Sequence, residues 1–204
     1  MFPDETDMSG WDLKKALRLF KSSNPSLFEW LHSPIIYQMD ETFINEIRQM
    51  EDQYFNKEKA IFHYNHIYKK HNDRYIKDYG LPLKRFLYYL RGILVCKWLS
   101  DKGTIPPVRF TELVNATVED TDMKAKIAHL LELKKRSNEH NLEPVDEQLF
   151  AWTQEWAEFY NQKVEQLHPE KKTSHDDKLN KLMYDTVNRM ATEISNAASV
   201  QLFN

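Results

Sequence analysis

Three polar side chains, Lys84, Tyr88 and Arg91, follow one another at intervals of four and three residues in a stretch that is otherwise apolar. This spacing places them on one face of a helix. A cation in a helix that is otherwise buried needs an anionic partner. That partner is either a carboxylate of the same protein or a phosphate of a ligand, and the guanidinium of arginine suits bidentate binding to both. The spacing therefore indicates an internal salt bridge or a phosphate-binding face, where Tyr88 is placed to stack on a base or bond a phosphate oxygen.

Histidines gather in the preceding segment as His63, His66 and His71. On a helix, His63 and His66 are neighbours, whereas His71 lies about 140° around the axis from His66. The sequence has no His-Glu-x-x-His pattern, so we do not predict a zinc site. His63 lies at the rim of an apolar face, where a bond to backbone or carboxylate competes with a functional role. Cys96 lies in an apolar helix without a paired motif and is expected to be an inert core residue.

The elements that must position these residues are helices with marked ends. Asp12 is a good N-cap for a first helix, and Asn24-Pro25 ends that helix and starts a second with proline at its first position. Asn56 is expected to cap the helix that precedes the one over 83–100, and Gly103 to end the latter. Further helices are expected from Asp40 or Thr42 to Tyr54, around 110–114, over 122–137, from Pro144 to Tyr160 and over 178–198.

The composition favours long helices. Only four glycines occur in 204 residues, and glycine serves tight turns and phosphate loops, so a glycine-rich nucleotide cradle is not expected. Nothing after residue 11 alternates as a strand does. We predict an all-α fold, a multi-helix bundle of about eight or nine helices with a short extended N-terminal segment. Aromatic residues make up 13% of the chain, which suits helix packing and also a stacking surface for bases.

The net charge and the number of cysteines bear on the expected ligands and on the expected cellular compartment. The net charge of -3 gives no global steering toward nucleic acid, although a local basic face is compatible with it. The single cysteine excludes an internal disulfide and indicates a reducing compartment. The apolar run from Phe86 to Leu99 is too short to span a bilayer, so we expect a cytoplasmic protein. The cations of the first predicted helix are expected to form its solvated side: Lys14, Lys15, Arg18 and Lys21.

Segments that carry a family resemblance lie along nearly the whole chain, from about residue 7 to 190. They are Gly10-Trp11-Asp12-Leu13-Lys14-Lys15-Ala16-Leu17, Ser22 to Pro34, His63-Tyr64, Lys84 to Trp98 and Ile105-Pro106-Pro107. In these segments the chain resembles a predicted nucleotidyltransferase family of the DNA polymerase beta superfamily. The first two are similar to the junction between the catalytic strands and the helical part of that family.

The resemblance implies a catalytic signature, a Gly-Ser turn followed by an Asp-x-Asp pair, and none of the four glycines begins one. We therefore interpret the chain as the helical portion of such an enzyme, without its catalytic head. The resemblance also implies that Asp7 is the third metal-binding acid of the superfamily, with Asp12 as second candidate. A solvated loop acid and a helix cap are the respective alternatives. Without the other two acids, either residue would hold Mg²⁺ weakly.

The resemblance further implies where a nucleoside triphosphate would bind. In the family, the face that carries Lys84, Tyr88 and Arg91 lies beside the catalytic cleft, and His63 and Tyr64 match a pair in the helical part. The family implies Mg²⁺ and a nucleoside triphosphate, and neither is expected to bind tightly to this chain. The acceptor, whether RNA, protein or small molecule, is not indicated. A face left exposed by a missing catalytic part favours self-association, and no membrane partner is expected.

The expected domain organisation has four parts: a remnant of the catalytic strand at 1–11, a helical domain at 12–168, a linker at 169–177 and a C-terminal helix at 178–204 that packs on the bundle. Three functions stay open. The chain is the helical portion of an enzyme that transfers a nucleoside monophosphate and is inactive alone, or a non-enzymatic helical module that binds a nucleotide or an RNA end, or a structural interaction protein.

Overall fold

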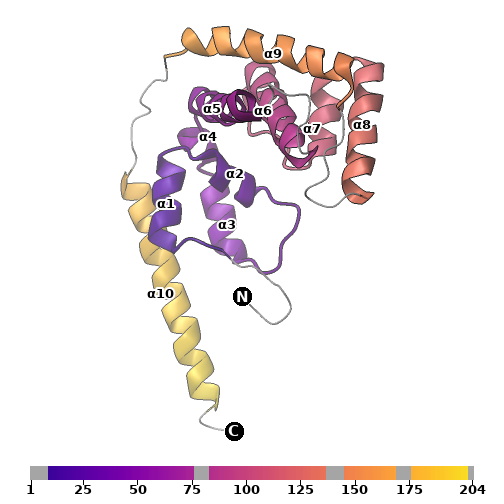
Figure 1. Ribbon diagram of the computed structural model, residues 1–204. Coiled ribbons are helices and arrows are strands. Elements are labelled where there is room, and N and C mark those ends of the chain that lie inside the picture. The colour runs from indigo at the N-terminus through magenta and orange to yellow at the C-terminus, as the bar shows by residue number, and fades with distance from the viewer. Residues whose placement is uncertain (1–8, 76–82, 137–144, 169–175, 202–204) are drawn as a thin grey trace. The chain divides into compact units, whose positions relative to one another are not determined.

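The computed structural model describes residues 9–75, 83–136, 145–168 and 176–201. Every regular element in these ranges is a helix, ten in all, which confirms the predicted all-α fold (Figure 1). The chain divides into two compact units. Unit 1 comprises residues 1–31, 35–55 and 171–204, and unit 2 comprises residues 32–34 and 56–170. The expected domain boundaries at 11, 168 and 177 stay predictions.

Unit 1 is built around a cluster of aromatic rings. Its helices are α1 (Leu13–Lys21), α2 (Pro25–Leu31), α3 (Glu41–Arg48), α4 (Glu51–Tyr54) and α10 (Asp176–Gln201). The ring of Phe20 lies 5.1 Å from that of Phe28 and 5.0 Å from that of Tyr54, measured between centroids. All three side chains are buried. The long helix α10 packs against α1 and α3, so helices that are far apart in the sequence share one unit.

The predicted junction between α1 and α2 is confirmed. The Asp12 side chain caps α1 by accepting a hydrogen bond from the Lys15 amide at 2.8 Å. At the other end, Ser23 adopts a left-handed conformation with φ 59°, which reverses the chain after the helix. The side chain of Asn24 then accepts from the Leu27 amide at 3.2 Å and starts α2, whose first residue is Pro25.

One predicted helix is wrong in its extent. The apolar pattern up to Tyr54 predicted a single helix, whereas the structure has α3 and α4 with a turn at Gln49 and Met50 between them. Asp40 caps α3 by accepting from the Phe43 amide at 3.0 Å. Neither glycine nor proline marks the break, and the sequence pattern alone does not indicate it. The turn allows Tyr54 to pack against the aromatic core.

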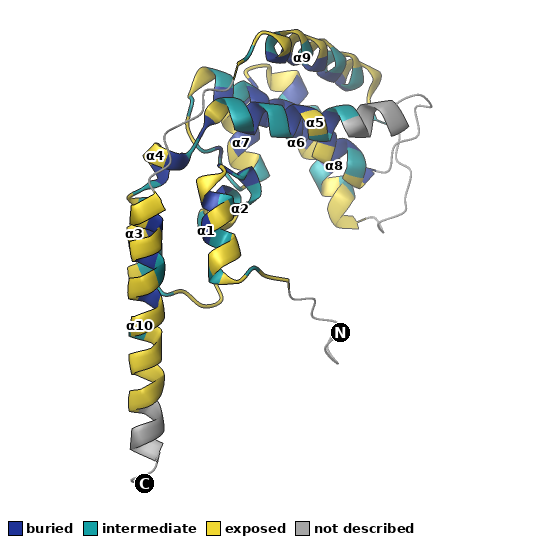
Figure 2. Ribbon diagram, turned by 90° about the vertical axis from the view of Figure 1, so that its left-hand side faces the viewer, coloured by how far each residue is buried: buried dark blue, intermediate teal, exposed yellow. Residues whose placement is uncertain are grey.

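Unit 2 is arranged around one central helix. Its helices are α5 (Lys57–Tyr75), α6 (Leu83–Asp101), α7 (Phe110–Thr117), α8 (Thr121–Arg136) and α9 (Glu147–Glu165). Helix α6 contacts each of the other four, and most of its side chains are buried, as the dark blue ribbon shows (Figure 2). This confirms the interpretation of the apolar stretch as a buried helix.

The ends of the helices in unit 2 follow local signals with one exception. Asn56 caps α5 by accepting from the Lys59 amide at 2.9 Å. Gly103, with φ 69°, follows the end of α6 and donates its amide to the Leu99 carbonyl at 3.1 Å. The exception is α9, which was expected to begin at Pro144 but begins after the N-cap Asp146. Pro144 itself lies outside the described residues. No helix within the described ranges is both long and apolar enough to cross a membrane.

Helices α5 and α6 approach closely at Gly92. A Cβ atom added to Gly92 would lie 3.2 Å from the Cβ of Tyr68 and 3.4 Å from the carbonyl oxygen of Tyr64. Both atoms are close to the backbone of α5, so neither can move without moving the helix. The absence of a side chain at Gly92 therefore sets the distance between the two helices.

Replacing Gly92 by alanine is expected to destabilise the protein. Helix propensity alone favours alanine by about 1 kcal/mol, and overpacking opposes it by about 1–3 kcal/mol. A net loss of about 0–2 kcal/mol in the free energy of unfolding is expected, measured by urea denaturation. Gly10→Ala is the matched control because nothing lies within 4 Å of an added Cβ there. A Gly92 variant more stable than the parent would mean that the helices accommodate the added methyl group at a cost smaller than the gain in helix propensity.

Candidate functional site

The side chains Lys84, Tyr88 and Arg91, here called the α6 stripe, mark the polar side of the central helix. Lys84 is exposed, Tyr88 is 53% exposed and Arg91 is half-buried. Between them, Leu87 and Leu90 point into the core and are 8% and 0% exposed. The stripe is thus a narrow accessible band on a helix whose other side chains hold unit 2 together.

Arg91 is oriented by the connector between α6 and α7. Its Nη1 donates to the carbonyl of Val108 at 3.2 Å and its Nη2 approaches the carbonyl of Pro107 at 3.5 Å. Earlier in the connector, the carbonyl of Thr104 accepts a hydrogen bond from the indole Nε1 of Trp98 at 3.1 Å. Side chains of α6 thus donate to several carbonyl groups of the connector. These contacts give Arg91 a structural role whatever else it binds.

His63 and Tyr64 lie on α5, the helix that packs along α6. Tyr64 is 6% exposed, and its backbone carbonyl faces Gly92. The ring of half-buried His63 meets that of Tyr64 edge to face, with 5.4 Å between centroids. Tyr64 is therefore part of the contact between helices, and His63 is the more accessible of the pair.

The two predicted metal-binding acids belong to a different unit of the chain from the α6 stripe. Asp7 lies outside the described residues. Asp12 is exposed and accepts the Lys15 amide, so one of its carboxylate oxygens acts as a helix cap. Both aspartates belong to unit 1, whereas the α6 stripe, His63 and Tyr64 belong to unit 2.

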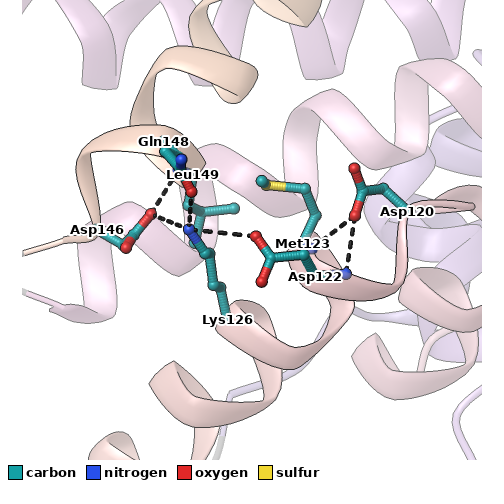
Figure 3. A network of polar contacts seen from close by, with 7 residues as sticks. All are labelled: Asp120, Asp122, Met123, Lys126, Asp146, Gln148 and Leu149. Carbon is teal, nitrogen blue, oxygen red and sulfur yellow. Dashed lines mark hydrogen bonds and ion pairs between the residues drawn. The ribbon is translucent and has the colours of Figure 1, made fainter.

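An Asp-x-Asp spacing does occur at Asp120 and Asp122, which the sequence analysis passed over, and both carboxylates have structural partners (Figure 3). Asp120 accepts the amides of Asp122 and Met123 at 2.8 and 3.1 Å and so starts α8. Asp122 forms an ion pair with Lys126, with 3.3 Å between carboxylate oxygen and ammonium nitrogen. Asp120 and Asp122 therefore lie at the start of a helix, not at the end of a strand after a Gly-Ser turn.

Lys126 links the beginnings of α8 and α9. Its ammonium group bonds the Asp146 carboxylate at 2.8 Å and also the side-chain oxygen of Gln148. The hydrogen bond from Lys126, assisted by the amide of Leu149, holds the pKa of the Asp146 carboxyl below its usual range. The same bond raises the pKa of Lys126. The Lys126 side chain is only 18% exposed, but both carboxylates that it meets are exposed to solvent. The network therefore contributes little stability, and Asp146 is engaged with a cation.

Among the described residues, no group of three or more histidines, cysteines, aspartates or glutamates is arranged to hold a metal ion. Two-metal transfer chemistry needs several carboxylates around one point. The carboxylates that the structure describes therefore do not fit the pair of Mg²⁺ ions that the resemblance implies.

The buried tyrosines between α5, α6 and α9 are not acid–base groups at neutral pH. The hydroxyl of Tyr68 donates to the side-chain oxygen of Asn161 at 2.9 Å, and Gln154 donates to the hydroxyl of Tyr89 at 3.0 Å. Burial raises the pKa of the Tyr68 and Tyr89 hydroxyls, so both stay protonated. Burial also raises the pKa of the Cys96 thiol, which is fully buried. Cys96 is an unreactive core residue in these surroundings, as predicted.

Comparison with known proteins decides the family. Residues 1–190 match the model of a family described as "RNA repair pathway DNA polymerase beta family" (RlaP). The chain belongs to this family. It is also similar to a Bacillus subtilis (strain 168) protein described as "Uncharacterized protein YcgL", with 36% identity over 184 residues, 90% of this chain and 70% of that protein. No solved structure matches the chain.

Membership of the RNA repair pathway DNA polymerase beta family confirms the resemblance seen in the sequence. It relates the chain to an RNA repair pathway and to polymerase beta-like nucleotidyltransferases. The match begins at residue 1 and extends through all of unit 2, so both units are part of what the family shares.

Proposed function

We propose that this chain supplies the nucleotide-side helical portion of an RNA-repair nucleotidyltransferase, with the α6 stripe as the contact to the triphosphate. Lys84 and Arg91 carry the positive charges, and Tyr88 offers a ring for stacking and a hydroxyl for a phosphate oxygen. His63 and Tyr64 on the neighbouring helix support that face. The reaction proposed for the family is transfer of a nucleoside monophosphate from a nucleoside triphosphate.

The observation that carries the proposal is the accessibility of Lys84 and Tyr88 on a helix most of whose residues are buried. Leu87 and Leu90 fix the helix in the core, so the stripe is held on a rigid element. The carbonyl groups of Pro107 and Val108 restrict the rotamers of Arg91. Preorganisation of this kind lowers the entropic cost of binding an anion.

Mg²⁺ is not assigned to any described residue in this proposal, because those carboxylates do not form a suitable set. Asp7 stays the proposed third acid and Asp12 the second candidate. Without a metal site, the α6 stripe is expected to bind a triphosphate weakly, with a Kd on the order of millimolar.

The experiment is isothermal titration of ATP, pyrophosphate and sulfate into the parent chain and four alanine variants, at Lys84, Tyr88, Arg91 and the control position Lys102. Lys84→Ala is expected to weaken ATP binding without changing the melting temperature, because the side chain is exposed. Arg91→Ala is expected to abolish binding and to lower stability by about 1–2 kcal/mol through the lost carbonyl contacts. Lys102→Ala is the matched control, since Lys102 is also exposed and follows α6 immediately.

The two roles of Arg91 are separated by comparing the variants. If Lys84→Ala and Tyr88→Ala bind ATP as the parent does, the α6 stripe is not a phosphate site and Arg91 is only a structural residue. If ATP binds through the stripe but no member of the family transfers nucleotides, the alternative holds and the chain is a non-enzymatic nucleotide-binding module.

A further inference from the structure

A groove between α1 and α10 brings together cations that the sequence analysis assigned to a solvated face. Its α1 side consists of Lys14, Arg18 and Lys21, at intervals of four and three residues, and its α10 side includes Asn180. The buried side chains of Leu17 and Leu179 form the floor. All of these residues belong to unit 1.

The groove is positively charged although the chain as a whole is not. Three cations and one carboxylate, Asp176, line it, which gives a local charge of +2 against -3 for the whole chain. Lys21 pairs with Asp176 at 2.6 Å. Lys14 and Arg18 form no ion pair with any described residue, and both are exposed. Their charges are therefore available to a ligand.

The size of the groove indicates what kind of anion fits. Its volume is about 240 Å³, below the roughly 300–1,000 Å³ of pockets that enclose a small molecule. Lys14 and Lys21 are separated by about 10 Å along the axis of α1, given the rise of a helix. Such a row of cations suits successive charges on a polymer better than a single mononucleotide.

We infer that the groove between α1 and α10 binds the phosphodiester backbone of a single-stranded RNA. Lys14 and Arg18 contact phosphates, while the apolar floor and the Asn180 amide face the sugar or base. Charge complementarity supports this occupant, because phosphate contacts by lysine and arginine dominate binding to nucleic acid. The choice of RNA rests on the proposed function, whereas the groove itself is independent of the α6 stripe.

The test measures binding of a fluorescein-labelled oligouridylate of about 12 nucleotides by fluorescence anisotropy, at salt concentrations from about 0.05 to 0.2 M. Lys14→Ala/Arg18→Ala is compared with the control Lys102→Ala/Lys134→Ala, which removes the same charge from exposed positions outside the groove. Each phosphate contact to a single strand contributes about 0.7 to the slope of log K against log salt. The groove variant is expected to lose about 1.4 from that slope and to bind about 25-fold more weakly at ~0.1 M salt.

Three outcomes decide the inference. Selective loss in the groove variant, with unchanged melting temperature and unchanged titration of ATP, supports it even if the α6 stripe fails its own test. Equal weakening of the groove variant and the control shows a general charge effect and overturns it. Equal competition by polyglutamate shows that the groove accepts an acidic protein as readily as RNA, and that also overturns it.

Discussion

Replacing Leu90 by alanine is expected to lower the free energy of unfolding by about 2–5 kcal/mol. Leu90 is completely buried and lies in the helix that every other helix of unit 2 contacts. Truncation there removes apolar surface from the core and leaves a cavity that the surrounding helices cannot fill. For a chain of this size, the melting temperature is expected to fall by roughly 4–20 °C.

Tyr88→Ala is the matched control, two positions away on the same helix. Tyr88 is 53% exposed, so its truncation is expected to cost less than about 1 kcal/mol. The measurement is urea unfolding followed by circular dichroism for both variants and the parent chain. Similar losses for Leu90→Ala and Tyr88→Ala would contradict the placement of the α6 stripe at the surface and of Leu90 in the core.

Local signals in the sequence predicted much of the fold. Asn24-Pro25, Asn56 and Gly103 each act through their own backbone conformation or through an amide three residues away, so their roles follow from nearby residues. The buried character of most of α6 was likewise predicted, because apolar residues on nearly all sides of a helix leave little of it to face water. These features need no knowledge of which segments meet in space.

Contacts between distant residues could not be predicted from the same patterns. Lys21 and Asp176 are 155 positions apart, and nothing in either segment indicates that α10 forms a groove with α1. The pairing of Arg91 with backbone carbonyls was missed for a related reason. Only an anion was considered as the partner of this half-buried cation, and the proline-containing connector also presents carbonyl oxygens that accept from a guanidinium.

Only part of the candidate site could be predicted from the sequence. The spacing of Lys84, Tyr88 and Arg91 predicted a shared helical face, and the structure places all three on α6. The Asp-x-Asp spacing at Asp120 and Asp122 shows the opposite case. Spacing alone does not distinguish a metal site from a helix cap and an ion pair, and the structure assigns the latter roles.

The second large effect concerns activity. We expect that this 204-residue chain alone transfers no nucleotide. Transfer requires several carboxylates around two metal ions, because the ions align the reacting groups and neutralise the triphosphate. The described residues offer no such set, and Asp7 with Asp12 cannot replace three acids. The chain is expected to contribute phosphate contacts from the α6 stripe without the acids that activate the transfer.

The most direct measurement is incubation of the purified chain with each of the four radiolabelled nucleoside triphosphates, Mg²⁺ or Mn²⁺, and an RNA or protein extract. A family member that carries the Gly-Ser and Asp-x-Asp motif is the positive control. We predict labelled product in the control and none with this chain. Labelling by this chain that disappears in Asp7→Ala would contradict the account, because the chain would then supply its own metal-binding acids.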